Sequence, residues 1–154
     1  MNHPTNQSVR YGIIGCGMMG QEHLRNIALL PGASVSCIFE PDDDMATSSL
    51  GLAPGARRAG SLAEVVSAAD VDCLLIASPN FCHAEQLREI AALRRLPVLL
   101  EKPACTSLAD ARALAELGRH YPAPIWVAME YRYMPPVARL TEEVHSAKNT
   151  GPVT

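Results

Sequence analysis

Short apolar runs alternate with helix-like segments along the whole sequence, and this alternation restricts the fold more than any other feature. The run at 72–77 is apolar on both faces, which is typical of a central parallel strand covered by helices on both sides. Alternation with short connections predicts an α/β fold, a doubly wound parallel sheet between two layers of helices. Strands are predicted at 9–14, 34–39, 72–77, 97–100 and 125–129, and helices at 18–30, 41–51, 61–69, 81–95, 107–120 and 135–146.

The turn after the first predicted strand is rich in glycine and reads GCGMMG over residues 15–20. In a GxGxxG turn, Gly15 permits the tight bend, Gly17 lets the backbone approach a pyrophosphate, and Gly20 lets the next helix pack closely on the strand. The N-terminus of that helix then directs free N–H groups at the phosphates. Glycine-rich turns also occur for purely structural reasons, so the motif gains its weight from its place between a strand and a helix. A dinucleotide-binding Rossmann fold is predicted, with six residues at the cofactor: Gly15, Cys16, Gly17, Met18, Met19 and Gly20.

Glu40 ends the second predicted strand, twenty positions after Gly20. A carboxylate at this point accepts hydrogen bonds from the ribose hydroxyls of the adenosine half of NAD. It also repels the 2'-phosphate of NADP, and residues 41–44 contain no arginine or lysine that would attract that phosphate. NAD is therefore predicted in preference to NADP, the alternative for Glu40 being a solvated charge at a strand end.

Length, composition and charge exclude several other classes of protein. The 154 residues suit one domain, and contents of 48% hydrophobic and 19% charged residues exclude a disordered chain. A net charge of -3, without a basic run longer than two residues, argues against a nucleic-acid partner. No apolar stretch suits a membrane span and no signal-peptide pattern opens the chain, so a cytoplasmic protein is expected. The five cysteines lack CxxC spacing, and neither a metal site nor a disulfide framework is predicted.

Four short motifs follow one another between residues 78 and 135. They are Ser78-Pro79-Asn80-Phe81-Cys82-His83, Glu85-Gln86, Glu101-Lys102-Pro103 and Tyr131-Arg132-Tyr133-Met134-Pro135. In this order they resemble the Gfo/Idh/MocA family of oxidoreductases, whose members carry [ST]-P-N-x-x-H, E-Q, E-K-P and Y-R-[YF]-x-P. Four ordered motifs are more specific than any one of them, and the resemblance runs from about residue 9 to the C-terminus.

The resemblance implies hydride transfer between a nicotinamide and a hydroxyl or carbonyl carbon of a sugar, polyol or related small molecule. Lys102 is the implied catalytic residue, because the family's lysine lies near the reacting hydroxyl, where an ammonium stabilises negative charge or relays a proton. The alternative is an exposed lysine before a proline turn. The resemblance also implies that a further set of residues, Lys102 among them, borders the cofactor: Ser78, Pro79, Asn80, His83, Glu101, Lys102 and Arg132.

Three of these residues have structural alternatives. Asn80 is also suited to cap the following helix. His83 stands in the first turn of that helix, where a structural or cofactor-adjacent role is as well supported as a chemical one. Arg132 is equally suited to brace a loop through ion pairs.

The same resemblance divides the chain into a flexible segment at 1–8, a dinucleotide-binding domain at 9–150, and the start of a link at 151–154. Family members are longer, and their second, α+β domain completes the substrate pocket, supplies a catalytic histidine and often mediates homo-oligomerisation. That domain is expected to be absent here, so a small-molecule substrate and a homo-oligomer are expected of a longer protein, and turnover by these residues alone is not. Two other interpretations are a catalytically inactive NAD-binding sensor or interaction module, and a methyltransferase, against which the E-K-P and Y-R-Y segments argue.

Overall fold

A six-stranded parallel sheet forms the centre of the computed structural model, which describes residues 8–146. The strand order is β3-β2-β1-β4-β5-β6, so the chain moves outward in one direction from β1, then crosses back and moves outward in the other. This is the predicted doubly wound arrangement. The predicted link at 151–154 lies outside the described residues, as does the predicted flexible segment 1–8 except for its last residue. The strands are β1 (Val9–Ile14), β2 (Ala33–Phe39), β3 (Arg57–Arg58), β4 (Cys73–Ile76), β5 (Val98–Glu101) and β6 (Ile125–Ala128).

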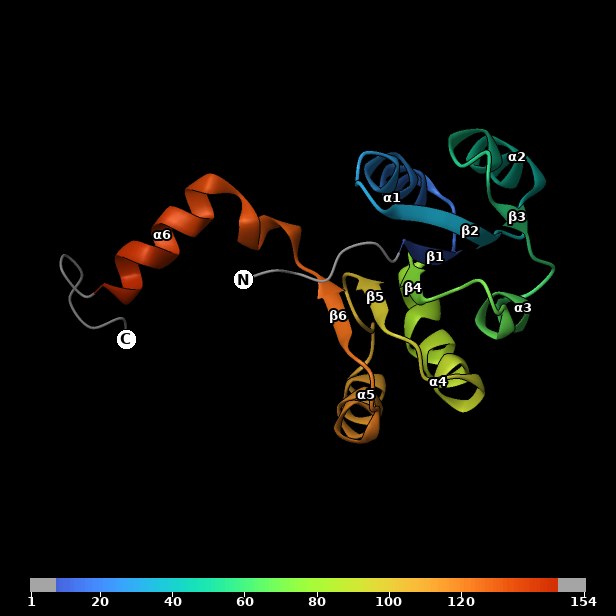
Figure 1. Cartoon of the computed structure of the whole chain (residues 1–154). Helices are drawn as coiled ribbons and strands as arrows, with labels where there is room; N and C mark the ends of the chain where they lie inside the picture. The colour runs from blue at the N-terminus through green and yellow to red at the C-terminus, as the bar shows by residue number, and fades with distance from the viewer. Residues whose placement is uncertain (1–7, 147–154) are drawn as a thin grey trace.

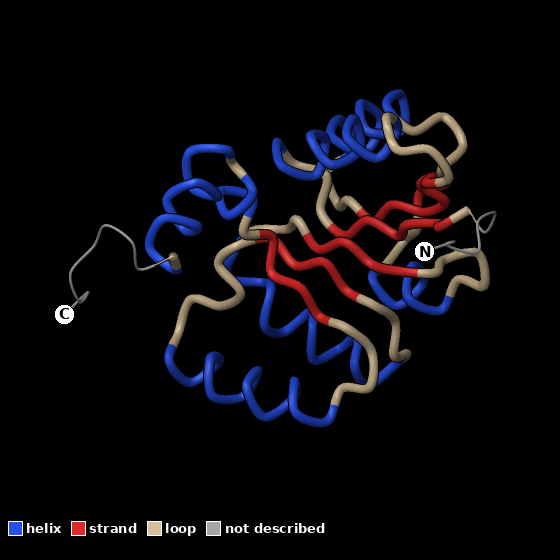
Figure 2. The backbone as a smooth tube through the Cα atoms, turned by 60° about the vertical axis from the view of Figure 1, so that its left-hand side comes forward, coloured by secondary structure: helices blue, strands red, loops and turns tan. Residues whose placement is uncertain are grey.

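Helices cover both faces of the sheet (Figure 1, Figure 2). The first two lie over one face, the next three lie over the other, and α6 stands away from the sheet (Figure 1). None of the helices within residues 8–146 combines the length and apolar character that a membrane span requires. The helices are α1 (Met18–Ala28), α2 (Asp43–Leu52), α3 (Leu62–Ser67), α4 (His83–Leu93), α5 (Leu108–His120) and α6 (Pro135–His145), with short 3-10 turns at η1 (Asn80–Cys82) and η2 (Glu130–Tyr133).

One row of side chains crosses the sheet on the face that α1 covers. Strand register places Ile38, Ile13, Leu75, Leu99 and Trp126 side by side. The first three are buried together with residues of α1. Leu99 is half-buried, and Trp126 is 58% exposed. Parallel sheets are ordinarily covered on both faces. Here, by contrast, the exposure of Trp126 shows that the β5–β6 half of this face is open, and a hollow of about 730 Å³ lies along it.

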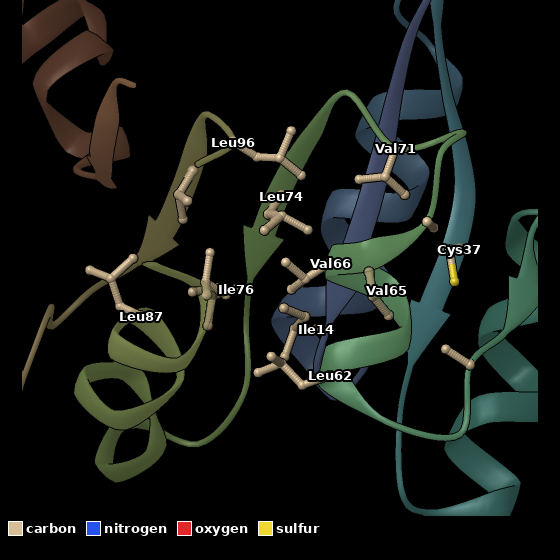
Figure 3. Close-up of a cluster of buried hydrophobic side chains, with 14 of the residues drawn as sticks. Ile14, Cys37, Leu62, Val65, Val66, Val71, Leu74, Ile76, Leu87 and Leu96 are labelled. Carbon is tan, nitrogen blue, oxygen red and sulfur yellow. The ribbon is translucent and has the colours of Figure 1, made fainter. Parts of the chain in front are cut away.

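The opposite face carries the larger apolar cluster (Figure 3). Ile14, Leu74 and Ile76 project from β1 and β4 and pack against Val65 and Val66 of α3, all of them fully buried. Burying apolar surface contributes roughly 25 cal/mol per Å². The central strands β1 and β4 are consequently held by close packing on both faces.

The predicted elements are confirmed, with their ends within a few residues of the predicted ones, except in two places. Strand β3 was not predicted, because two arginines carry no apolar pattern; it forms by pairing Arg57 and Arg58 with Cys37 and Ile38 of β2. The predicted helix 81–95 begins instead with the 3-10 turn η1 before α4.

An ion pair at the start of β1 makes stability depend on acid pH. Hydrogen bonds from Arg10 to Asp72, the shortest contacts being 2.9 Å, lower the pKa of that carboxyl from 3.8 to about 2. A lowered pKa stabilises the fold above pH 4, and this contribution is lost as the pH falls from about 4 to about 2.

We expect Asp72→Asn to lower the free energy of unfolding most above pH 4, and the difference from the wild type to shrink between pH 4 and pH 2. Both side chains are about 40% exposed, so solvent screening keeps the effect small. Urea denaturation at a series of pH values measures it, with the exposed Asp44→Asn as control. A gap that stays constant across this range would contradict the assignment.

Candidate cofactor site

The carboxyl ends of β1, β2 and β4 border one groove, at the point where the strand order reverses between β1 and β4. Open α/β sheets bind their ligands at such a switch point. The groove has a volume of about 480 Å³. It is lined by seven of the predicted cofactor residues, namely Gly15, Gly17, Met18, Met19, Glu40, Ser78 and Pro79, together with Ile14, Phe39, Pro41, Met45, Ala77, Cys82 and Gln86.

Each of the three glycines of the loop is needed for a different structural reason. Gly15 has a φ of 85°, and a Cβ there would lie 2.4 Å from the backbone N of Ser78. A Cβ on Gly20 would lie 2.2 Å from the carbonyl oxygen of Gly15, so α1 packs directly on the turn. Gly17 has nothing within 4 Å of its Cβ position, so that its bare backbone faces open space. Gly15 and Gly20 are thus required by the fold itself, and Gly17 leaves room for a ligand.

The N-terminus of α1 is open toward the groove. Gly17 is the N-cap residue, no side chain caps the helix, and its first turn contains no carboxylate. The free N–H groups of a helix N-terminus attract an anion such as a pyrophosphate. Cys16 behaves differently from its neighbours, because its side chain is fully buried and burial raises the pKa of its thiol to about 11.

Glu40 is buried where β2 reaches the groove. Its Oε2 accepts a hydrogen bond from the backbone N of Cys16 at 2.7 Å, and its Oε1 accepts one from the backbone N of Asp42 at 3.0 Å. Each carboxylate oxygen has a further lone pair that is free to accept from a ligand hydroxyl. The carboxylate is therefore held in one orientation by the glycine loop and by the turn after β2.

Arg58 on β3 is a site residue that the sequence did not reveal. Its guanidinium donates to the carbonyl oxygen of Glu40 at 2.9 Å and to the carboxylate of Asp43 at 2.7 Å. With Glu40 and Pro41 it lines a second hollow of about 600 Å³. The strand that carries Arg58 is only two residues long and has no apolar pattern. The sequence therefore offered only the pair Arg57-Arg58, outside the expected motifs, as a sign of this residue.

The loop after β4 lies across the groove from Glu40. The Ser78 hydroxyl donates to Oε1 of Gln86 on α4, which fixes the side of the groove. Pro79 and Asn80 are exposed. The alternative role of Asn80 as a helix cap is wrong, because neither η1 nor α4 has a side-chain cap hydrogen bond.

His83 is fully buried beneath the groove instead of facing it. Its Nδ1 lies 2.8 Å from the carbonyl oxygen of Pro103, and its Nε2 lies 2.9 Å from that of Ser78. Each ring nitrogen thus faces a backbone carbonyl oxygen, and the tautomer decides which of the two accepts the ring N–H. Of the predicted roles for His83, direct contact with a cofactor does not fit this burial, whereas a structural role does.

Lys102 and Arg132 lie at a separate hollow of about 350 Å³ beside the same edge of the sheet, lined also by Pro103, Met129, Glu130 and Tyr131. Lys102 follows directly after β5 and its side chain is exposed, whereas Glu101 is buried. The Glu101 carboxylate faces His23 of α1 at 2.7 Å. The structure thus places seven of the predicted residues on the groove and two, Lys102 and Arg132, on the Lys102 hollow. Asn80 is exposed outside both hollows, and four predicted residues are buried outside them: Cys16, Gly20, His83 and Glu101.

Comparisons with known proteins agree with this geometry. The family described as "Oxidoreductase family, NAD-binding Rossmann fold" matches residues 9–129. The rhizopine catabolism protein MocA of Rhizobium meliloti is 30% identical over 138 residues, which cover 89% of this chain. An inositol 2-dehydrogenase of Corynebacterium glutamicum is 33% identical over 145 residues, covering 92% of this chain. The chain spans 42% of the length of each of these two relatives.

The fold is also found in solved structures. The myo-inositol dehydrogenase of Lactobacillus casei, solved in complex with NAD(H) and myo-inositol, superposes with a TM-score of 0.87 at 22% identity. The match covers 95% of this chain and 44% of that one. At this identity the likeness shows the fold alone, and the match at residues 9–129 shows the family. The chain belongs to the Gfo/Idh/MocA oxidoreductases and contains the family's NAD-binding Rossmann domain.

Proposed function

We propose that this chain supplies the cofactor-binding part of an NAD-dependent dehydrogenase that acts on a secondary alcohol of a polyol or sugar. The observation that carries the proposal is that the open N-terminus of α1 and Glu40 share one groove, with Lys102 at the neighbouring strand end. The substrate class is inferred from relatives named inositol 2-dehydrogenase and from the solved myo-inositol dehydrogenase. We also propose that the longer protein is a cytoplasmic homo-oligomer, because the family resemblance implies a second domain that often mediates oligomerisation.

The residues present fit NAD. The free N–H groups at the start of α1 and the open space at Gly17 suit the pyrophosphate. The fixed carboxylate of Glu40 suits the ribose hydroxyls of the adenosine half. Ser78 and Pro79 would border the middle of the dinucleotide on the opposite wall. Bound in this way, the nicotinamide supplies the acceptor for a hydride.

The proton chemistry is assigned to Lys102. Oxidation of a secondary alcohol removes a hydride from the carbon and a proton from the hydroxyl oxygen. As an ammonium, the exposed Lys102 side chain would donate a hydrogen bond to that oxygen and stabilise the negative charge that develops on it. As a neutral amine, it would accept the hydroxyl proton and pass it to solvent. Arg132 on the same hollow adds positive charge that would favour an electron-rich substrate oxygen.

The direct test of the proposal is calorimetric titration of this chain with NADH and with NADPH. We expect saturable binding of both, with NADH bound more tightly. If neither NADH nor NADPH binds, the proposal is contradicted.

Glu40→Ser should change the preference between the two cofactors. We expect the affinity for NADH to fall about tenfold, which corresponds to losing a hydrogen bond to a charged acceptor. Glu40 also holds the glycine loop by accepting a hydrogen bond from the backbone N of Cys16. Losing this hydrogen bond should weaken the binding of NADH and of NADPH equally. The ratio of the NADH and NADPH dissociation constants therefore isolates the ribose contact. Glu22→Ser, on the exposed side of α1, is the matched control, and an unchanged ratio in Glu40→Ser would refute the ribose contact.

A further inference from the structure

A histidine contacts the residue on each side of Lys102. On the N-terminal side, Nε2 of His23 donates to Oε1 of Glu101 at 2.7 Å. On the C-terminal side, Nδ1 of His83 lies 2.8 Å from the carbonyl oxygen of Pro103. The two histidines belong to α1 and α4, which lie on opposite faces of the sheet (Figure 1). The Glu101–Pro103 segment is thus fastened from both faces at the point where it leaves β5.

Both contacts are protected from water. Glu101 is 5% exposed and His83 is fully buried, and the His23 side chain is 19% exposed. Hydrogen bonds in such surroundings are stronger than at the surface, and a buried polar group that loses its partner is costly. Lys102 itself is exposed, and its ammonium group stands on a flexible four-carbon side chain. Its position therefore depends on how firmly its backbone is held.

The contact on the α1 side reaches the Lys102 backbone directly. The second oxygen of the Glu101 carboxylate, Oε2, accepts a hydrogen bond from the backbone N of Lys102 at 3.1 Å. His23 fixes the other oxygen of the same carboxylate, so the orientation of the carboxylate and the orientation of the Lys102 peptide are linked. His23 is also three residues after Gly20, in the helix whose N-terminus borders the groove.

We propose that His23 is a positioning residue for Lys102, acting through Glu101 and linking the cofactor helix α1 to the Lys102 segment. This inference rests on the proposed role of Lys102 in the reaction. His23 does not touch the reacting atoms in this assignment. Its function is to hold the peptide that carries the amine while the side chain of Lys102 reaches into its hollow.

The test uses the fact that the chain contains only two lysines, Lys102 and Lys148. Labelling with ¹⁵N-lysine gives two backbone amide resonances, and Lys148 serves as the internal reference. His23→Leu removes the donor, whereas His23→Gln keeps an N–H donor at a similar reach. His120→Leu is the matched control, because His120 also pairs with a glutamate, Glu116 at 3.1 Å, but at an exposed site on α5.

Without cofactor, we expect His23→Leu to shift the Lys102 amide resonance and to speed its hydrogen exchange about tenfold, which corresponds to about 1.4 kcal/mol. His23→Gln and His120→Leu should keep the wild-type position and rate. A purely structural role would leave the Lys102 signal unmoved in a folded variant, or would not be rescued by glutamine. If His23→Leu does not fold, Glu101→Gln replaces it, because it keeps the size of the side chain while removing the carboxylate, and the same shift is expected.

Adding NADH separates this inference from the proposed function. A shift in His23→Leu without cofactor, together with wild-type affinity for NADH within about threefold, supports the positioning role. An unchanged Lys102 signal in both His23→Leu and Glu101→Gln overturns the inference, whether or not NADH binds. Failure of the wild-type chain to bind NADH overturns the proposed function, and the signals without cofactor still decide the role of His23.

Discussion

Gly20→Ala should abolish measurable NADH binding and lower the stability of the fold as well. A Cβ at this position would lie 2.2 Å from the carbonyl oxygen of Gly15, so α1 and the turn must move apart. Overpacking of this kind costs about 1–3 kcal/mol. The displaced helix N-terminus would also no longer face the pyrophosphate, and we expect the affinity to fall by at least about a hundredfold, which corresponds to roughly 2.7 kcal/mol.

Gly17→Ala separates binding from folding at the same loop. Its Cβ position has nothing within 4 Å, so the methyl fits without strain. Gly17 is the N-cap of α1, where alanine is less favourable than glycine, and this offsets the gain from reduced chain entropy, so the variant should keep about the wild-type free energy of unfolding. The added methyl would nevertheless project into the space assigned to the pyrophosphate. We expect a loss of affinity comparable to that of Gly20→Ala, without the loss of stability.

Calorimetry for NADH affinity and urea denaturation for stability measure the two effects on the same preparations. Gly51→Ala in α2 is the control, because its Cβ position is equally open but lies away from the groove. It should keep NADH affinity and gain a few tenths to 1 kcal/mol of stability through reduced chain entropy. Wild-type NADH affinity in Gly17→Ala would disprove the assignment of the pyrophosphate to this loop.

Lys102→Met should remove most turnover while leaving cofactor binding intact. A positioned acid–base group contributes about 10²–10⁴-fold to a rate, and methionine keeps the length of the side chain without its charge. Lys102 lines its own hollow with Arg132, and the glycine loop and Glu40 line the other groove. The NADH affinity should therefore stay within about threefold of the wild type.

The turnover measurement requires a protein that continues beyond residue 154 to the length of the relatives, assayed with NAD⁺ and myo-inositol. The NADH titration is done on this chain. Lys148→Met, which removes the other lysine, is the control for lost charge. Turnover within tenfold of wild type in Lys102→Met would rule out the proton-transfer role.

The order of elements was predictable because each strand and helix has a local pattern. The run at 72–77 is apolar without a break, and β4 is indeed a central strand buried on both faces. Gly15-to-Gly20 spacing placed the turn between β1 and α1 correctly. Strand β3 was missed because its two arginines are brought into the sheet by pairing with β2, a long-range contact that leaves no local pattern.

The site was predictable as a set of residues but not as an arrangement. The motifs located Glu40, Ser78 and Lys102 at strand ends, and the structure puts them at the carboxyl edge of the sheet. Burial does not follow from a motif, which is why His83 and Glu101 were assigned to the cofactor although their side chains turn inward. Arg58 was missed for a different reason, because its hydrogen-bond partners Asp43 and Glu40 lie 15 and 18 positions away in sequence.

The distribution of buried side chains has a consequence for how the domain melts. β1 and β4 are closely packed on both faces, whereas α5 and α6 contain no buried residue and Trp126 on β6 is largely exposed. Local opening begins where few apolar contacts must be broken. The α5–β6–α6 end should therefore fray at temperatures at which β1, β4 and the glycine loop that follows β1 are still native. The groove is thus built on the last part of the domain to unfold, and the hollow around Lys102 and Arg132 on its less stable margin.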